Sequence, residues 1–427
     1  MPAADLEVTG ARGEAGGADA DRPALRRCTH LEPDVFAARI WGHEASLSTR
    51  EQLPGGFGDL FDLDAVDRLV SRQGLRTPFL RVAKDGQTYA ASRFTRGGGV
   101  GATINDQVDD AALTRLYADG ATIVLQGLHR THGPLVDFGR QLTADLGHPV
   151  QINAYVTPPQ AQGFSDHYDV HDVFVLQVAG EKRWFIREPV LRHPTRDQPW
   201  TDHRAAVEAA ARQTPLIDVV LRPGDALYLP AGFLHAAQAL GETSAHLTVG
   251  VHTWTRTHLL TELVRSLQAV EGLREPLPLG IDVSDPAEVG LELQETIDSL
   301  RAALQEDALV TPVVDRMTRL AQDASRAESV GPMAQARAVA ALDLWTRLRW
   351  RHGLRATLVP GEDEVTVRTP ETAVRVPVAV EPALRRLLAG EVLAVAELGA
   401  ADEAPLDDTT RLEVAGTLLR SAVVVPE

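Results

Sequence analysis

Residues 166–180 read DHYDVHDVFVLQVAG, and this stretch places two imidazoles and three carboxylates at the start of an apolar run. The run is rich in β-branched and aromatic residues and ends at glycine, a pattern typical of a buried β-strand. Side chains two residues apart on a strand share a face, so His167 and Asp169 can reach one ion while Tyr168 points away. The stretch therefore predicts a strand that begins with a candidate metal-binding pair.

The other ionisable residues of this stretch are interpreted differently. The apolar residues from 173 to 176 indicate a break in the chain near residues 170–172. We therefore expect Asp166, His171 and Asp172 at the rim of the site or behind its ligands, where such groups orient the residues that bind the metal.

A third ligand must come from another strand, and residues 221–237, LRPGDALYLPAGFLHAA, supply a candidate. Pro223-Gly224-Asp225 predicts a turn, and the bend at Pro230-Ala231-Gly232 lets His235 begin the next strand. Two histidines and one carboxylate on neighbouring strands form the triad that binds ferrous iron and leaves positions open, although the same donors also accept zinc.

Short β-branched runs separated by Gly, Pro and Asp extend from about residue 31 to residue 255 and predict a sandwich or barrel. The clearest strand segments are residues 121–128, 150–157, 172–180, 182–187, 216–230 and 245–254. Residues 133–147 repeat apolar side chains at helical spacing.

After residue 255 the pattern becomes helical, which indicates a domain boundary. Asp285-Pro286 predicts a helix start, with Glu288 reaching back as in a capping box. The apolar stripe of this helix suits packing within the chain or a homodimer interface.

The last part of the chain reads as a winged-helix-like domain. We expect a helix through Leu342 and Trp345, two strands at residues 356–369, and short helices at the following positions: 382–389, 392–398 and 408–420. The last of these helices lacks the basic face that a DNA reader needs, so nucleic-acid binding is not expected.

The composition of the chain excludes some kinds of metal site and favours some kinds of partner. The chain has 427 residues, 44% of them hydrophobic, and a formal charge of −17, which suits a basic protein partner or simply solubility. Cys28 is the only cysteine, so a disulfide within the chain and a thiolate metal cluster are both excluded. We expect a cytoplasmic protein with a disordered tail at residues 1–29 and without a signal peptide or membrane span.

Residues 153–184, NAYVTPPQAQGFSDHYDVHDVFVLQVAGEKRW, together with residues 221–237, resemble the Jumonji-C ribosomal oxygenases. These are cupin-fold protein hydroxylases that depend on Fe(II) and 2-oxoglutarate, and the resemblance extends from SRFTRGGG at residues 92–99 to the C-terminal region. It implies an α+β protein with a double-stranded β-helix (cupin/JmjC jelly roll), a helical dimerisation bundle and a winged-helix-like domain. The implied divisions are a tail at 1–29, a catalytic domain at 30–255, a dimerisation domain at 256–335, and a winged-helix-like domain at 336–427.

The resemblance also assigns roles to single residues. It implies three Fe(II) ligands, namely His167, Asp169 and His235. Lys182 matches the lysine that pairs with the distal carboxylate of 2-oxoglutarate, and Asn153 and Tyr155 match positions that line the cosubstrate pocket. The chain departs from the family at Gly250, where a hydroxyl side chain is frequent and Thr248 could substitute.

The implied function is hydroxylation of an arginine or histidine side chain of a ribosomal or other basic protein, with O2 as the oxidant. A second hypothesis keeps the enzyme class and changes the substrate to a small molecule or a peptide natural product. A third is a non-catalytic cupin and winged-helix regulator, and a redox-inert zinc cupin is a further alternative.

Overall fold

The computed structural model describes residues 22–84, 86–159, 161, 165–305, 309–400 and 405–427. The chain packs as two units that divide between Thr253 and Trp254, two residues before the predicted boundary. No helix among the described residues combines the length and the apolar character that crossing a membrane requires.

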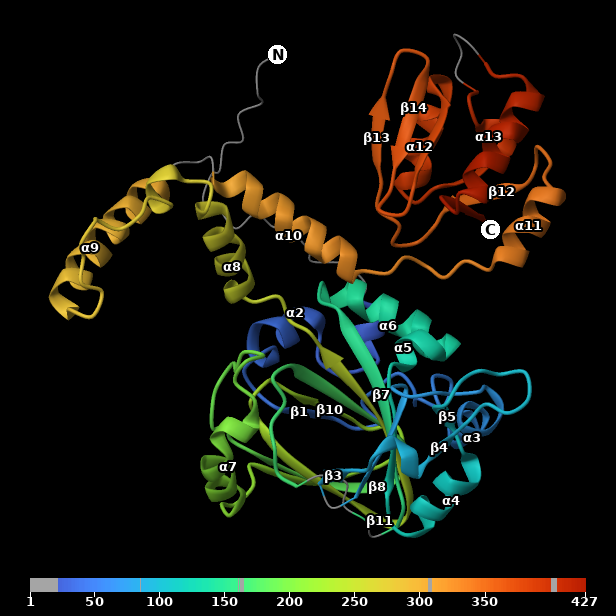
Figure 1. Cartoon of the computed structure of the whole chain (residues 1–427). Coiled ribbons are helices and arrows are strands. Elements are labelled where there is room, and N and C mark those ends of the chain that lie inside the picture. The colour runs from blue at the N-terminus through green and yellow to red at the C-terminus, as the bar shows by residue number, and fades with distance from the viewer. Residues whose placement is uncertain (1–21, 85, 160, 162–164, 306–308, 401–404) are drawn as a thin grey trace. The chain divides into compact units, whose positions relative to one another are not determined.

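Unit 1 is built on a curled sheet of antiparallel strands, with the order β1-β10-β8-β11-β7-β6-β2-β3 and with β9 paired to β8 (Figure 1). All six strand segments predicted from the sequence contribute to it. The strands are β1 Ser46–Ser48, β2 Leu80–Lys84, β3 Gln87–Thr88, β6 Thr122–Leu125, β7 Val150–Thr157, β8 Asp172–Arg187, β9 Ile217–Leu221, β10 Ala226–Leu229 and β11 Leu234–Val251. A separate pair consists of β4 Thr95–Arg96 and β5 Gln107–Val108.

The sequence predicts two strands, at residues 172–180 and 182–187, but the structure has the single strand β8 across Gly180. This glycine adopts a left-handed conformation with φ of 59°, and a Cβ there would lie 2.2 Å from the carbonyl oxygen of Thr243. The carboxamide of Gln177 donates to the carbonyl of Gly180 and to Ser244 Oγ, each at 2.9 Å. The strand therefore bends without ending, because glycine permits the turn and Gln177 satisfies the backbone across it.

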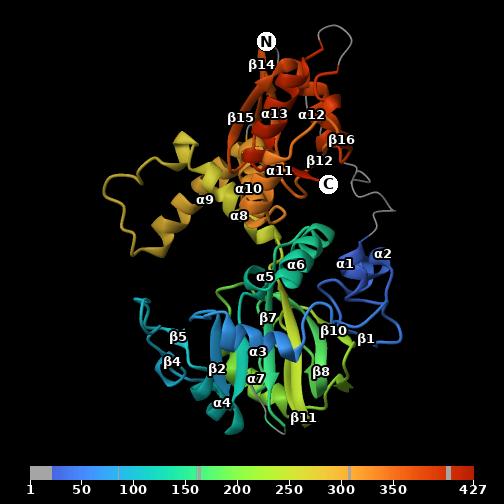
Figure 2. The ribbon, with the colours of Figure 1, turned by 90° about the vertical axis from the view of Figure 1, so that its right-hand side faces the viewer.

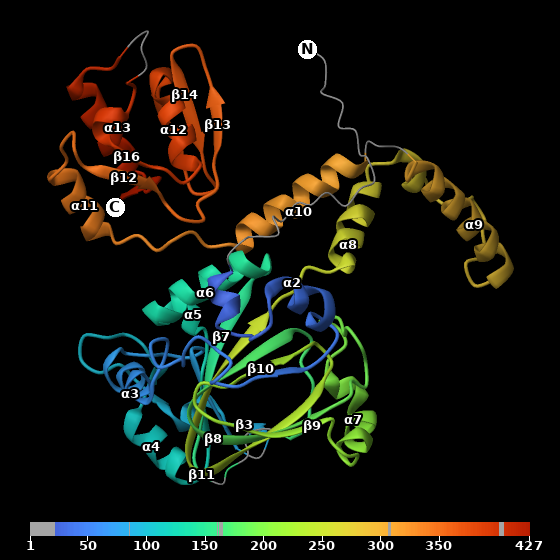
Figure 3. The ribbon, with the colours of Figure 1, turned by 180° about the vertical axis from the view of Figure 1, so that it is seen from behind.

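The helices of unit 1 are α1 Pro23–Arg26, α2 Pro33–Val35, α3 Leu63–Arg72, α4 Asp110–Ala118, α5 Leu128–Thr131, α6 Gly133–Leu146 and α7 Arg204–Ala211. Helices α5 and α6 lie together beside β7 (Figures 2 and 3). The predicted helix at 133–147 is confirmed, and Gly147 ends it in a left-handed conformation.

Side-chain alternation along β8 separates the two faces of the sheet. Phe174 and Leu176 pack into the core that the helices complete, together with Leu135 and Leu142 of α6. Val173 and Val175 point to the other face, where they line a cavity. The sheet thus has one face covered by helices and one face around a cavity.

The N-terminal region differs from the predicted disordered tail at 1–29. Ala24 and Leu25 in α1 are each 1% exposed, and their backbone N–H groups both donate to Asp145 Oδ2 at 2.8 and 3.0 Å. The carboxylate on α6 thus satisfies the free donors of the helix start, and apolar burial holds the segment in place. Residues 1–21 of the predicted tail lie outside the described residues.

Unit 2 begins with α8 Arg256–Leu267, α9 Pro286–Ala303 and α10 Val310–Ala324, of which α8 and α10 pack together. Asp285 caps α9 as predicted, since its side chain accepts from the backbone N–H of Ala287 at 2.8 Å. The capping box is corrected: Glu288 accepts instead from the N–H of Asp282, at 2.8 Å, because the chain before the helix makes a tight turn there.

The rest of unit 2 has two three-stranded sheets, β16-β12-β17 and β13-β14-β15. Its elements are α11 Pro332–Ala340, β12 Arg347–Trp350, β13 Thr357–Pro360, β14 Glu364–Arg368, β15 Ala373–Pro377, α12 Glu381–Leu388, β16 Val392–Ala394, α13 Asp408–Arg420 and β17 Val424–Pro426. Two predicted helices are only partly right here, since α11 is shorter than expected and only residues 395–397 of the predicted helix at 392–398 are helical. Helix α11 ends before Leu342 and Trp345, and residues 392–394 form a strand because Leu393 pairs with Leu348 of β12.

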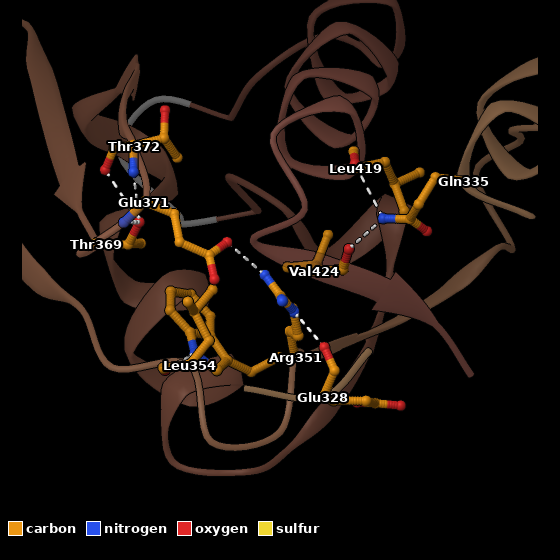
Figure 4. A network of polar contacts seen from close by, with 10 residues as sticks. Glu328, Gln335, Arg351, Leu354, Thr369, Glu371, Thr372, Leu419 and Val424 are labelled. Atoms are coloured by element: carbon orange, nitrogen blue, oxygen red, sulfur yellow. Dashed lines mark hydrogen bonds and ion pairs between the residues drawn. The ribbon is translucent and has the colours of Figure 1, made fainter. Parts of the chain in front are cut away.

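Two buried polar side chains join these elements (Figure 4). Gln335 of α11 donates to the carbonyls of Leu419 and Val424, both at 2.9 Å, and so links the helix to α13 and β17. Arg351 donates to the carbonyl of Glu328 and to the carboxylate of Glu371, both at 2.7 Å. Arg351 thus links the end of β12 to the chain before α11 and to the turn between β14 and β15.

Candidate metal centre

His167, Asp169 and His235 meet on the cavity face of unit 1. His167 and His235 are a backbone pair: each N–H donates to the carbonyl of the other residue, at 3.2 and 2.9 Å. Asp169 Oδ2 lies 3.7 Å from His235 Nε2, and one ligand atom from each residue lies within 4.8 Å of the others. The structure therefore brings together the three residues that the sequence pattern singled out.

Both imidazoles are oriented by backbone carbonyls. Nδ1 of His167 lies 2.8 Å from the carbonyl of Ser165, and Nδ1 of His235 lies 3.1 Å from that of Phe233. A carbonyl only accepts, so each Nδ1 carries the hydrogen and each Nε2 presents its lone pair. This donor set of two neutral nitrogens and one carboxylate fits a divalent transition metal.

The charges of the site also suit a cation. Burial opposes ionisation of Asp169, but His235, His171, His167 and Arg81 together hold the pKa of its carboxyl below the ordinary value. Burial lowers the pKa of His235 to about 4, so its ring is neutral at neutral pH. An ionised carboxylate beside a neutral imidazole is the state that metal binding requires.

The remaining residues of the first stretch do not join the triad. Tyr168 points away as predicted, and its hydroxyl donates to the carbonyl of Gln198 at 2.9 Å. Asp172 is buried rather than on a rim, and it accepts from Tyr228 Oη at 2.6 Å and from the N–H of Ala231 at 2.9 Å. Burial raises the pKa of Asp172. Its two hydrogen bonds tie the start of β8 to β10 and to the loop before His235.

Asp166 forms an ion pair with Arg187, at the far end of β8. His171 stacks on His252 with ring centroids 5.2 Å apart. A Cβ on Gly250 would lie 2.5 Å from Nε2 of His171, so the missing side chain at position 250 makes room for this imidazole. The departure from the family pattern at Gly250 thus has a steric explanation.

A cavity of about 600 Å³ opens beside the triad, and the described residues that line it include Lys182, Tyr155 and Thr248. Lys182 is 4% exposed, and its Nζ donates to Thr157 Oγ1 at 3.1 Å. Burial lowers the pKa of this ammonium group to about 7. A buried amine at one end of a cavity and a metal-ligand set at the other suit a ligand that is anionic at both ends.

Tyr155 and Asn153 differ in their positions. Both lie on the same face of β7, but Asn153 is absent from the described residues that line the cavity. Its Oδ1 accepts from the backbone N–H of Gly127 at 3.0 Å. The hydroxyl of Tyr155 lies 3.4 Å from Arg81 Nη2, and burial raises its pKa.

Several cavity residues were not identified from the sequence. They are Arg81, Thr157, Trp184, Trp200, Arg204 and His246. Strand alternation could have found His246, since it lies two residues before Thr248 on β11 and pairs with Tyr155 of β7. Arg204 carries no such signal, because its guanidinium reaches the site from α7 by stacking on Trp200, 4.8 Å from the ring centroid.

The region around the site is similar to known proteins. The model of the JmjC domain matches residues 139–259, which contain all three triad residues. Over 228 residues the chain is 31% identical to Ribosomal oxygenase 1 of Homo sapiens, covering 52% of this chain and 34% of that protein. Over 131 residues it is 35% identical to the Bifunctional lysine-specific demethylase and histidyl-hydroxylase NO66 of Drosophila persimilis, covering 30% of this chain and 18% of that protein.

The matched region therefore spans about a third of the length of Ribosomal oxygenase 1. A solved structure of a ribosomal oxygenase from Escherichia coli in complex with cobalt and 2-oxoglutarate aligns over 93% of this chain and 98% of that chain, at 17% identity and a TM-score of 0.48. Residues 139–259 therefore match a JmjC domain that contains the triad, and about half of the chain is similar to ribosomal oxygenases.

Proposed function

We propose that this chain is an Fe(II)- and 2-oxoglutarate-dependent hydroxylase of a ribosomal or other basic protein, and that it modifies an arginine or histidine side chain. One observation carries the proposal: two oriented imidazoles and a carboxylate converge at a cavity that also contains a buried lysine. Three protein ligands leave coordination positions for a chelating cosubstrate and for O2. Bound Fe(II) would couple the oxidative decarboxylation of 2-oxoglutarate to hydroxylation of a C–H bond.

In this proposal the chain holds, orients and encloses the reactants. His167, Asp169 and His235 hold the metal, with the backbone carbonyls of Ser165 and Phe233 fixing the imidazole orientation. A fixed ligand set costs little reorganisation when substrate binds, and positioning of this kind supplies much of the rate of such reactions.

Lys182 would bind the distal carboxylate of 2-oxoglutarate, and Tyr155 would offer its hydroxyl to the same ligand. Both residues line the cavity, and the ammonium group has a hydroxyl partner but no carboxylate partner among the described contacts. A role for Asn153 in contacting the cosubstrate has less support, because its carboxamide is bonded to Gly127. We propose that Asn153 instead fixes the chain at the start of α5.

The charges around the cavity favour histidine over arginine as the target. Arg81 and Arg204 line it beside the lysine proposed to pair with 2-oxoglutarate, and Asp169, a proposed metal ligand, is its only carboxylate among the described lining residues. A guanidinium that entered would meet cations without a free carboxylate to pair with, and an unpaired buried charge is costly. A neutral imidazole does not carry this penalty. The charge of −17 on the whole chain suits a basic partner protein outside the cavity.

The test uses protein reconstituted anaerobically with Fe(II) and then exposed to O2 and 2-oxoglutarate. Three basic peptides that differ only in a central His, Arg or Ala are compared by succinate release and by mass spectrometry for one added oxygen. We expect oxygen incorporation into the His peptide. Incorporation into the Arg peptide alone would contradict the charge argument, and absence of succinate with every peptide and with ribosomal protein extracts would contradict the proposed enzyme class.

We also propose that the chain forms a homodimer through α8, α9 and α10. These helices expose apolar side chains, among them Leu260, Leu291, Leu293 and Val314. Exposed apolar area of this kind on amphipathic helices is typical of an interface. Light scattering should give twice the chain mass, and Leu291→Glu with Leu293→Glu should give the monomer, whereas Leu216→Glu, an equally exposed leucine of unit 1, should leave the dimer intact.

A further inference from the structure

His246 lies on β11 at the cavity face, and two aromatic rings hold it there. Its imidazole is parallel to the ring of Tyr155, with an interplanar angle of 6° and centroids 5.1 Å apart. The indole of Trp184 also contacts it edge to face, at 83° and with centroids 5.3 Å apart. Contacts with two aromatic rings restrict the orientation of the imidazole, so the ring is positioned before any ligand binds.

Packing explains the orientation of His246 but leaves its Nδ1 without a partner among the described residues. The side chain is 3% exposed, and Nδ1 is buried without a hydrogen-bond partner among the described residues. A buried polar atom left unpaired costs about 1–3 kcal/mol, so its retention calls for a compensating role. Burial, with the nearby charge of Lys182, lowers the pKa of His246, so the ring is neutral and keeps one N–H to donate.

Lys182 lies close enough to His246 for its charge to lower the pKa of that ring. Its ammonium group also lacks a charged partner among the described residues. The group is buried, it donates to the hydroxyl of Thr157, and burial makes its charged form costly. The sole carboxylate among the described lining residues is Asp169, a proposed metal ligand. A carboxylate brought in by a ligand would compensate both nitrogen groups at once.

Ring contacts relate His246, and through it Lys182, to the proposed metal ligands. The indole of Trp184 contacts both His235, with ring centroids 6.1 Å apart, and His246, with ring centroids 5.3 Å apart. His246 is thus linked to a proposed metal ligand through one indole, and it also feels the charge of Lys182. The distal end of a metal-bound dicarboxylate would reach this pair.

We propose that His246 is a cosubstrate-binding residue that donates a hydrogen bond to the distal carboxylate of 2-oxoglutarate beside Lys182, while Tyr155 and Trp184 hold its ring. The inference rests on the proposed function, and it goes beyond the residues assigned there. It makes His246 a determinant of cosubstrate selectivity, since a 2-oxo acid without a distal carboxylate gains nothing from it.

The experiment measures ligand binding rather than turnover. Mn(II)-loaded full-length protein is titrated by calorimetry with 2-oxoglutarate and, separately, with pyruvate, which keeps the 2-oxo acid group but lacks the distal carboxylate. His246→Phe keeps a ring between Tyr155 and Trp184 without a hydrogen-bonding atom, His246→Leu removes the ring, and His246→Gln restores a donor. Circular dichroism confirms folding, and if one apolar variant does not fold the other serves.

We expect the apolar variants to bind 2-oxoglutarate about tenfold or more weakly, the scale of a hydrogen bond to a charged group, and to bind pyruvate as the wild type does. His246→Gln should recover most of the loss. Equal weakening of both ligands would mean a structural role only, and unchanged 2-oxoglutarate binding would overturn the inference.

Lys182→Met separates this inference from the proposed function. If wild type binds 2-oxoglutarate and Lys182→Met does not, while His246→Phe binds normally, only the role of His246 is refuted. If wild type itself does not bind 2-oxoglutarate, the proposed function and this inference are both refuted.

Discussion

Replacing Lys182 with methionine should stabilise the ligand-free protein while removing cosubstrate binding. Burial lowers the pKa of this amine from 10.5 to about 7, so folding forces it to give up either its proton or its solvation. Each pKa unit corresponds to about 1.36 kcal/mol, which puts the penalty at about 4 kcal/mol at pH 7.5. Methionine is of similar length and carries no charge, so it avoids this penalty.

The stability difference between the wild type and Lys182→Met depends on pH, because Lys182 binds its proton less tightly in the folded chain than in the unfolded chain. Between pH 7 and pH 10.5 the unfolded chain holds a proton on Lys182 that the folded chain has released, so the wild type gains stability as the pH rises. The advantage of the methionine variant should therefore fall to about 2 kcal/mol at pH 9 and vanish above the unfolded pKa. Below pH 7 it should reach its constant maximum.

Thermal unfolding of unit 1, followed in buffers without carboxylates, measures the difference. A penalty of this size raises the melting temperature of the variant by on the order of 10 °C at pH 7.5. Added 2-oxoglutarate with Mn(II) should reverse the order, because the wild type alone gains ligand stabilisation. Lys84 is the only other lysine in the chain, and Lys84→Met should show neither trend.

Two results would refute this reasoning. One is a wild type more stable than Lys182→Met at pH 7.5 without ligand, and the other is a stability difference that does not shrink between pH 7.5 and pH 9.5. With just two lysines, reductive ¹³C-methylation would also give two resolvable side-chain signals, so the pKa of Lys182 can be measured directly by NMR.

Further predictions concern the triad and the bend in β8. Asp169→Ala should lose metal, measured by elemental analysis, and turnover, whereas His171→Ala should largely keep both, since His171 is absent from the described lining of the cavity. The reverse outcome would show the ligand assignment to be wrong. Gly180→Ala should lower the melting temperature far more than Gly241→Ala, because both have positive φ but only the first places a Cβ against backbone, 2.2 Å from Thr243 O. Equal shifts would mean that backbone conformation, not steric overlap, requires the glycine.

Local pattern predicted which residues converge but misplaced the start of the strand. Strand β8 begins at Asp172, so His167 and Asp169 lie before it, with His167 in an isolated bridge to His235. The predicted separation of Tyr168 from this pair is confirmed, because its hydroxyl bonds to the carbonyl of Gln198 instead. The place of Asp172 could not be predicted this way. Its burial depends on Tyr228 and on the backbone of Ala231, more than fifty residues away, and the sequence alone could not decide between a place at the rim and one behind the ligands.

The helix and strand errors in unit 2 have a similar origin. Residues 392–394 are apolar and compatible with a helix, but pairing with β12 decides in favour of a strand. In unit 1, Gly180 is a typical strand breaker, and Gln177 compensates for it with hydrogen bonds that no local rule anticipates. Contacts between distant segments therefore account for what the pattern missed.

The backbone pairing of His167 with His235 has a consequence for how metal and protein come apart. The two residues enclose 67 others, and two hydrogen bonds already close that loop without any ion. A metal held by their side chains is a second link between these two residues. When the metal leaves, the two backbone hydrogen bonds still hold the residues together. Chelation should then remove the ion and leave a template that rebinds without refolding, unlike small domains in which the metal itself closes the chain.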